Sequence, residues 1–201
     1  MNSKAKKVAL IGMFSALSYV VVLLVRIPMV TVSPTFVLSY EAKDIIIALC
    51  GFLLGPTASF ITSVIVSFLE MITISNTGFI GFFMNVISSC AFACTANIIY
   101  KKIRSVTGLT IGLVAGVITS TVAMLLWNYI MTPIFTGNPR EVVAELLTPI
   151  FLPFNLAKNG INAGFCFVIN APIIYALKVS KILDAEFANN KIKYNKIDNR
   201  M

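Results

Sequence analysis

The chain has 201 residues, of which 58% are hydrophobic and 12% charged, with a net charge of +8 and a mean hydropathy of +0.90. A soluble domain carries about 25% charged residues, so this composition leaves too little polar surface for a water-soluble globule and excludes a disordered chain, a coiled coil and a secreted disulfide scaffold. We predict an all-α integral membrane protein that crosses the bilayer several times.

Long stretches without charge predict six transmembrane helices, since about 20 helical residues cross a bilayer core of ~30 Å. Proline, glycine and short polar segments divide these stretches. The predicted helices cover approximately residues 7–26, 43–51, 56–74, 79–100, 108–131 and 156–180. They form a single transmembrane substrate-binding domain over residues 1–183. Residues 184–201 are polar and basic and are predicted to be a cytosolic tail.

Two segments between the predicted helices are rich in proline. Residues 27–41 are too polar and too proline-broken to span a bilayer, and their apolar side chains predict an extracellular lid loop over the bundle. A plain connector is the alternative. Residues 132–139 are predicted to break the fifth helix.

The basic residues predict the orientation of the chain through the positive-inside rule. With six helices, twelve of the sixteen basic residues fall on one face: Lys4, Lys6, Lys7, Lys101, Lys102, Arg104, Lys178, Lys181, Lys191, Lys193, Lys196 and Arg200. We therefore expect a multi-pass protein of a bacterial plasma membrane with both termini in the cytoplasm. The positive charge then reflects topology, and nucleic acid is not an expected partner.

The residues favour binding over catalysis. The chain has no histidine, which is the most frequent general base and a common metal ligand. Its four cysteines, Cys50, Cys90, Cys94 and Cys166, lie in apolar segments, where small packing residues are expected. A phosphate-binding Gly-x-x-x-x-Gly-Lys-Ser/Thr motif is absent. We expect no metal site, no cofactor and no enzymatic activity.

Three polar side chains predict a binding site near the outer face. Lys158 is the one charged residue between Glu145 and Lys178, and Asn155 lies three residues earlier on the same helical face. Asn128 lies at a similar depth in the fifth predicted helix. Amide and ammonium groups beside aromatic rings suit a flat heterocycle with polar edges. Alternatively, Lys158 extends to the lipid headgroups and the asparagines pair between helices.

Two further features leave alternatives open. Glu70, near the outer end of the third predicted helix, could bind a ligand hydroxyl, pair with Lys158 or lie among headgroups. Ala9, Gly12 and Ala16 form a stripe of small residues on the first helix, which allows another helix to approach closely. Packing within the bundle would explain this stripe equally well.

The chain resembles the substrate-capture (S) components of energy-coupling factor (ECF) transporters, specifically the riboflavin-binding subfamily, over roughly residues 5–180. The resemblance rests on Leu-Pro-Phe-Asn-Leu-Ala-Lys-Asn-Gly at 152–160, Trp-Asn-Tyr at 127–129 with Pro133, Tyr-Glu-Ala-Lys-Asp-Ile at 40–45, Gly-Phe-Leu-Leu-Gly-Pro at 51–56 and Thr-Gly-Phe-Ile-Gly at 77–81. The Pro-Phe-Asn-x-x-Lys segment is the most specific of these.

The resemblance implies a high-affinity riboflavin-binding subunit of a vitamin uptake transporter, energised through a transmembrane coupling subunit by two cytosolic ATPases. Family residues that match Asn128, Asn155 and Lys158 contact the isoalloxazine ring. Positions that match Leu38, Thr77 and Gly78 close around the ligand. The small-residue motif on the first helix contacts the coupling subunit, and here it reads Gly12-x-x-x-Ala16, with Ala9 on the same stripe.

Two other functions stay open. An S component of the same architecture could serve another small metabolite. A self-sufficient secondary carrier would be a different class of protein, but the sequence lacks the inverted repeat and the matched broken helices typical of many carriers.

Overall fold

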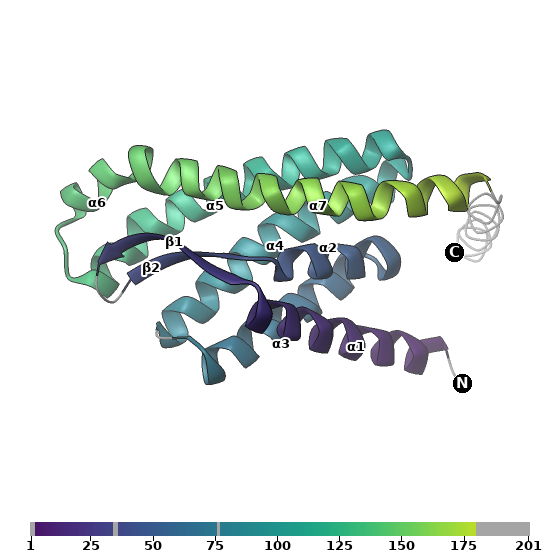
Figure 1. Ribbon diagram of the computed structural model, residues 1–201, viewed down its shortest axis with the longest axis horizontal. Helices are drawn as coiled ribbons and strands as arrows, with labels where there is room; N and C mark the ends of the chain where they lie inside the picture. Colours follow the sequence, from purple (N-terminus) through teal and green to yellow (C-terminus); the bar gives the residue numbers. More distant parts are fainter. Residues whose placement is uncertain (1–2, 34–35, 76, 180–201) are drawn as a thin grey trace, which may run out of the picture.

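The computed structural model describes residues 3–33, 36–75 and 77–179, which form long helices and one small hairpin (Figure 1). The elements are α1 (Ser3–Leu24), β1 (Arg26–Ser33), β2 (Phe36–Glu41), α2 (Lys43–Leu54), α3 (Pro56–Thr73), α4 (Gly78–Ile103), α5 (Val106–Thr136), α6 (Arg140–Leu146), the π-helical turn η1 (Leu147–Phe151) and α7 (Leu152–Val179). The start of α1 and the end of α7 lie at one end of the bundle, while the hairpin and α6 lie toward the other (Figure 1). The predicted tail at 184–201 lies outside the described residues.

Among the described residues, four helices are long and apolar enough to cross a bilayer: Lys4–Leu24, Pro56–Thr73, Gly78–Ile103 and Val106–Thr136. Each of the six predicted helices corresponds to a helix of the structure. However, α2 has 12 residues and at 1.5 Å per residue is only about 18 Å long. The helix α7 has 28 residues but contains Lys158 and several asparagines. A multi-pass membrane protein is therefore supported, and the count of six full spans stays a prediction.

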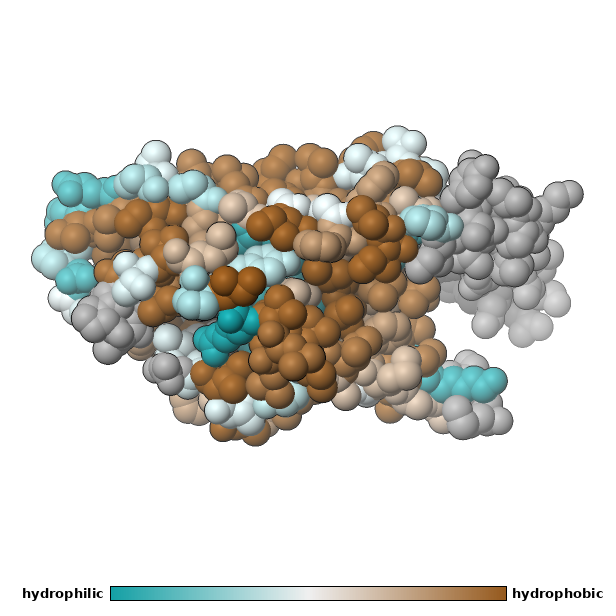
Figure 2. All heavy atoms as spheres, viewed as in Figure 1, coloured by the Kyte–Doolittle hydropathy of each residue, from teal (hydrophilic) through white to brown (hydrophobic). Residues whose placement is uncertain are grey.

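The surface supports this assignment, because apolar side chains point outward along the helices. Val8, Leu24 and Phe79 are 70% or more exposed, and Figure 2 shows hydrophobic residues over much of the visible face. The interior, in contrast, holds many buried serine, threonine and asparagine side chains. Such a distribution is typical of helices that are surrounded by lipid and joined by polar contacts inside the bundle.

The structure corrects three predicted helix ends. The second helix does not end at Gly51 but continues to Leu54, and the break falls at Gly55, whose φ of +97° suits glycine. The fifth helix does not break at residue 132; it runs through Pro133 to Thr136 and ends at Gly137, with φ of +72°. Proline is tolerated in membrane helices because neighbouring groups satisfy the backbone atoms that it frees.

The third correction concerns the chain between the last two long helices. The final helix begins at Leu152 and not at residue 156, because Pro153 lies in its first turn, where a missing N–H costs no helical hydrogen bond. The sequence reading also missed α6 and η1, which fill most of the connection from α5. Together these elements form a continuous helical path into α7.

The segment predicted as a lid loop is an antiparallel hairpin. Arg26 of β1 pairs with Glu41 of β2, and Val30 pairs with Leu38, with a register shift after Pro28. Proline has no N–H for the strand ladder, which accounts for an irregularity at this place. A lid function of the hairpin stays a prediction.

Glycines bring α4 and α5 into close contact. A Cβ atom on Gly112 would lie 2.6 Å from the backbone oxygen of Ala96, and one on Gly116 would lie 2.7 Å from that of Phe92. Neither distance is compatible with a side chain. Close helix packing of this kind is common in membranes, where dispersion contacts replace the hydrophobic effect, and it fixes the positions of the two helices that carry Asn85 and Asn128.

Candidate functional site

The hairpin and the helices α3, α4, α5 and α7 surround a cavity of about 690 Å³, including the part open to solvent. Its wall combines charged, amide and hydroxyl groups with a few apolar side chains. These residues are Arg26, Val37, Leu38, Ser39, Glu41, Glu70, Ile74, Ser75, Thr77, Met84, Asn85, Ser88, Met124, Asn128, Phe154, Asn155 and Lys158. A concave wall that combines a few charged and amide groups with apolar side chains is typical of a small-molecule site.

Five of the six predicted ligand-binding residues line this cavity: Leu38, Thr77, Asn128, Asn155 and Lys158. The sixth, Gly78, is not in the wall but begins α4 directly after Thr77, with φ of +53°. The wall is therefore assembled from five separate parts of the chain: the hairpin, the end of α3 with the turn after it, the first half of α4, the second half of α5 and the start of α7.

Leu38 belongs to a small apolar cluster that joins the hairpin to the last helix. It is 5% exposed and packs with Val143, Phe151 and Phe154. The hairpin thus rests on the segment that leads into α7, and Leu38 and Phe154 of this cluster line the cavity.

The asparagines present complementary hydrogen-bonding groups. Asn128 is 1% exposed, and its Oδ1 accepts a hydrogen bond of 3.1 Å from Oγ1 of Thr132, whereas its Nδ2 has no partner among the described residues. The Nδ2 of Asn155 donates to the backbone oxygen of Phe151 at 2.7 Å, so its side-chain oxygen is left as an acceptor. A buried amide donor without a protein partner is costly, so this group is a candidate to bind a polar ligand atom.

Lys158 does not extend to the lipid headgroups. The residue is 7% exposed, and its Nζ lies 4.0 Å from Oε2 of Glu41 in the cavity wall. The alternative of a headgroup contact is therefore wrong for this conformation. Two of the roles considered for Glu70 also fail, since it is 2% exposed and its ion-pair partner is Lys43 instead of Lys158.

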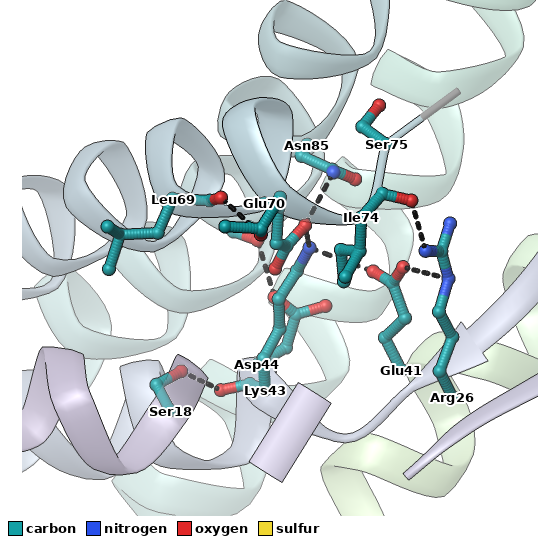
Figure 3. A network of polar contacts seen from close by, with 12 residues as sticks. Ser18, Arg26, Glu41, Lys43, Asp44, Leu69, Glu70, Ile74, Ser75 and Asn85 are labelled. Carbon is teal, nitrogen blue, oxygen red and sulfur yellow. Dashed lines mark hydrogen bonds and ion pairs between the residues drawn. The ribbon is translucent and has the colours of Figure 1, made fainter. Parts of the chain in front are cut away.

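A buried network of ionic contacts lies beside the cavity (Figure 3). The Nζ of Lys43, which is fully buried, lies 2.8 Å from Oε2 of Glu41 and 2.5 Å from Oε2 of Glu70. The same oxygen of Glu70 accepts a hydrogen bond of 2.7 Å from Nδ2 of Asn85. Arg26 lies 3.5 Å from Oε1 of Glu41 and donates to the backbone oxygen of Ile74. The network connects the hairpin with α2, α3 and α4.

This network shifts the ionisation of Glu41. Burial by itself would raise the pKa of the Glu41 carboxyl, but the positive charges of Lys43, Lys158 and Arg26 outweigh burial and lower the pKa to about 2. Glu41 is therefore ionised at neutral pH and serves as the shared anion of three cationic side chains.

Sequence reasoning did not predict the roles of Glu41 and Lys43 beside the cavity. The signal was present in the segment Tyr40–Asp44, where three charged residues stand at the start of an apolar helix. Such residues are expensive to bury and usually mark a functional site. Further residues of the wall that were not predicted are Arg26, Val37, Ser39, Ile74, Ser75, Met84, Asn85, Ser88, Met124 and Phe154.

The cysteines make contacts within the helical bundle. Cys90 Sγ lies 2.9 Å from Oγ of Ser63, and the sulfur of Cys94 lies 3.7 Å from the backbone oxygen of Pro56. Cys50 and Cys166 are fully buried. Within the described residues no group of three or more histidine, cysteine, aspartate or glutamate side chains could hold a metal ion.

The stripe on α1 faces outward. Ala9, Gly12 and Ala16 are all exposed, and a Cβ atom on Gly12 would meet nothing within 4 Å. Packing inside the bundle therefore does not account for Gly12, and a contact with another subunit stays a prediction.

Fold and site together define a multi-pass membrane protein with a ligand cavity near one end of its helical bundle. A profile described as "ECF transporter, substrate-specific component" matches residues 6–174. The chain belongs to this family of substrate-specific components of ECF transporters. Membership in this family confirms the predicted resemblance. It also confirms the prediction that the chain is a transport protein and not an enzyme.

The proteins similar to the chain include a curated transporter and a solved structure. "Riboflavin transporter FmnP" of Bacillus subtilis (strain 168) is 26% identical over 165 residues, which cover 78% of this chain and 85% of the relative. A solved structure described as "Structure and mechanism of the S component of a bacterial ECF transporter" superposes with a TM-score of 0.72 at 24% identity, covering 88% of this chain and 99% of that chain. The second similarity shows a common fold.

Proposed function

We propose that the chain is the high-affinity riboflavin-binding subunit of an ECF-type uptake transporter. The observation that carries the proposal is the convergence of Asn128, Asn155 and Lys158 on one cavity, where the Nδ2 of Asn128 has no partner among the described residues. The similarity to a riboflavin transporter supports the same ligand.

The chemistry of riboflavin fits these groups. The pyrimidine-like edge of the isoalloxazine ring has carbonyl acceptors and one N–H donor. The Nδ2 of Asn128 and the ammonium of Lys158 can donate to the carbonyls, and the side-chain oxygen of Asn155 can accept from the N–H. Each of these bonds would satisfy a polar group that is expensive to leave unpaired in a buried site.

The remaining parts of riboflavin also find partners. A smaller apolar hollow adjoins the cavity and shares Thr77, Met84 and Asn128 with it. Trp127 and Phe135 also line this hollow. This hollow suits the dimethylbenzene end of the ring system. Ser39, Ser75 and Thr77 provide hydroxyl groups for the ribityl chain.

We infer the partners from the same assignment. A substrate-specific component needs a transmembrane coupling subunit and two cytosolic ATPases, since its own sequence lacks a nucleotide-binding motif. The outward-facing stripe of Ala9, Gly12 and Ala16 is the proposed contact with the coupling subunit. In this arrangement both termini lie in the cytoplasm and the cavity opens to the outside.

Binding of riboflavin by the purified chain tests the proposal. The protein is incubated with riboflavin in detergent and separated from free ligand by gel filtration, and the visible absorbance of the protein peak is recorded. We expect a yellow protein with about one flavin per chain. A colourless peak that retains a different metabolite, identified by mass spectrometry, would contradict riboflavin as the ligand.

A further inference from the structure

One face of α7 follows the end of the hairpin into α2. Residues four positions apart lie on the same face of a helix. The residues of this face are Phe154, Lys158, Asn162 and Cys166. Phe154 packs with Leu38 of β2, and Lys158 lies 4.0 Å from Glu41 at the end of that strand. Further along the face, the sulfur of Cys166 lies 3.8 Å from the backbone oxygen of Ile45 in α2.

Asn162 is hydrogen-bonded to two adjacent residues at the end of β2. Its side chain is fully buried, and its Oδ1 accepts a hydrogen bond of 3.0 Å from the hydroxyl of Tyr40. Its Nδ2 donates to the backbone oxygen of Glu41 at 3.4 Å. Asn162 does not line the cavity. The amide therefore fastens the end of the hairpin to α7 from outside the wall.

We propose that Asn162 is a positioning residue for Lys158. Together with Tyr40 it fixes the backbone of Glu41, and the carboxylate of Glu41 then holds the ammonium of Lys158 in the cavity wall. The inference rests on the proposed riboflavin site, in which Lys158 contacts the ligand and Asn162 does not.

The physical reason is the flexibility of the lysine side chain. Its ammonium ends a four-carbon stem that has many rotamers, and a group that is already held in its binding position loses less conformational freedom when the ligand binds. The carboxylate of Glu41 can hold the ammonium only if its own backbone stays at a fixed distance from α7. Asn162 lies one helical turn beyond Lys158 and sets this distance by its bond to the backbone of Glu41.

Affinities for riboflavin test the inference in a double-mutant cycle. Tyr40→Phe and Asn162→Ala are measured alone and in combination with Lys158→Ala. Alone, each should weaken binding by about two- to tenfold, because one hydrogen bond or two are lost from the clamp. Combined with Lys158→Ala, each should weaken it by no more than about twofold further, since the group that they position is gone. A general structural role would give the same loss in both backgrounds.

Two clamp variants are used because Asn162→Ala removes a buried side chain and could impair folding, which is checked by gel filtration, whereas Tyr40→Phe removes only a hydroxyl group. Tyr100→Phe is the matched control, since Tyr100 is 8% exposed against 7% for Tyr40 and lies away from the cavity wall. It should bind riboflavin like the wild type.

Two results would overturn the inference while the riboflavin site stands. One is wild-type affinity in both clamp variants, and the other is an equal loss of affinity with and without Lys158→Ala. Failure of the wild-type protein to bind riboflavin would overturn the proposed function and the inference with it.

Discussion

The Nζ atom of Lys43 lies 2.5 Å from Oε2 of Glu70, although 27 positions separate the two residues in the chain. Lys43 begins α2 and Glu70 lies near the end of α3. Both are buried, and the same ammonium also contacts Glu41 at the end of the hairpin. A single cation thus joins three elements around the cavity.

Replacement of Lys43 by methionine should destabilise the protein strongly. The variant keeps most of the side-chain volume but leaves the buried carboxylate of Glu70 without its cation and takes one of three cations from Glu41. Removing one partner of a buried ion pair typically costs about 3–5 kcal/mol. The measurement is the free energy of unfolding in detergent. Lys102→Met, at an exposed position of α4, is the control and should change it by less than about 0.5 kcal/mol.

A second substitution separates the charge effect from a packing effect. In the double variant Lys43→Met/Glu70→Gln, the negative charge that Lys43→Met leaves uncompensated at position 70 is absent. We therefore expect the double variant to be more stable than Lys43→Met alone. A double variant that is less stable than the single one would show that the ammonium does not act by neutralising Glu70.

The contribution of Glu41 should depend on pH. Its folded-state pKa is about 2, below the ordinary value of 4.5, so its ionised form stabilises the fold at pH values above 4.5, and this contribution is lost as the pH falls toward 2. Glu41→Gln should therefore be less stable than the wild type at pH 7, and the difference should disappear between about pH 4.5 and 2. Thermal unfolding of both proteins in detergent across this pH range measures the difference in stability. A difference that stays constant with pH would contradict the ion pairs of Glu41.

Alanine at Gly112 should force α4 and α5 apart. Its Cβ would lie 2.6 Å from the backbone oxygen of Ala96, and we expect a loss of about 1–3 kcal/mol in unfolding free energy because backbone atoms cannot move aside locally. Gly164→Ala, in α7, is the matched control, since its Cβ would meet nothing within 4 Å. Equal effects of the two substitutions would contradict the close packing of α4 on α5.

The three polar residues of the site could be predicted from the sequence, because the prediction depends on their spacing and depth within helices. Asn155 and Lys158 are three residues apart in one apolar helix, so their common face follows from helical geometry. The position of Asn128 followed from its depth in a neighbouring helix. These three residues do line one cavity in the structure.

Features that depend on distant partners could not be predicted. The pair of Lys43 and Glu70 joins two helices whose relative rotation the sequence does not state. The hairpin pairs Arg26 with Glu41. The segment between them contains two prolines, which predict an irregular loop instead of paired strands. Pro133 predicts a helix break from local sequence alone, although the surrounding bundle allows α5 to continue through it.

The most direct test of the riboflavin site is a titration that follows the quenching of riboflavin fluorescence by the wild-type protein and by Asn128→Ala, Asn155→Ala and Lys158→Ala. Each substitution leaves a polar group unpaired and should weaken binding by about 1–3 kcal/mol, or roughly five- to 150-fold. Asn170→Ala, which changes a buried asparagine of α7 away from the cavity wall, should bind like the wild type. Unchanged affinity in all three site variants would contradict the assignment of the site.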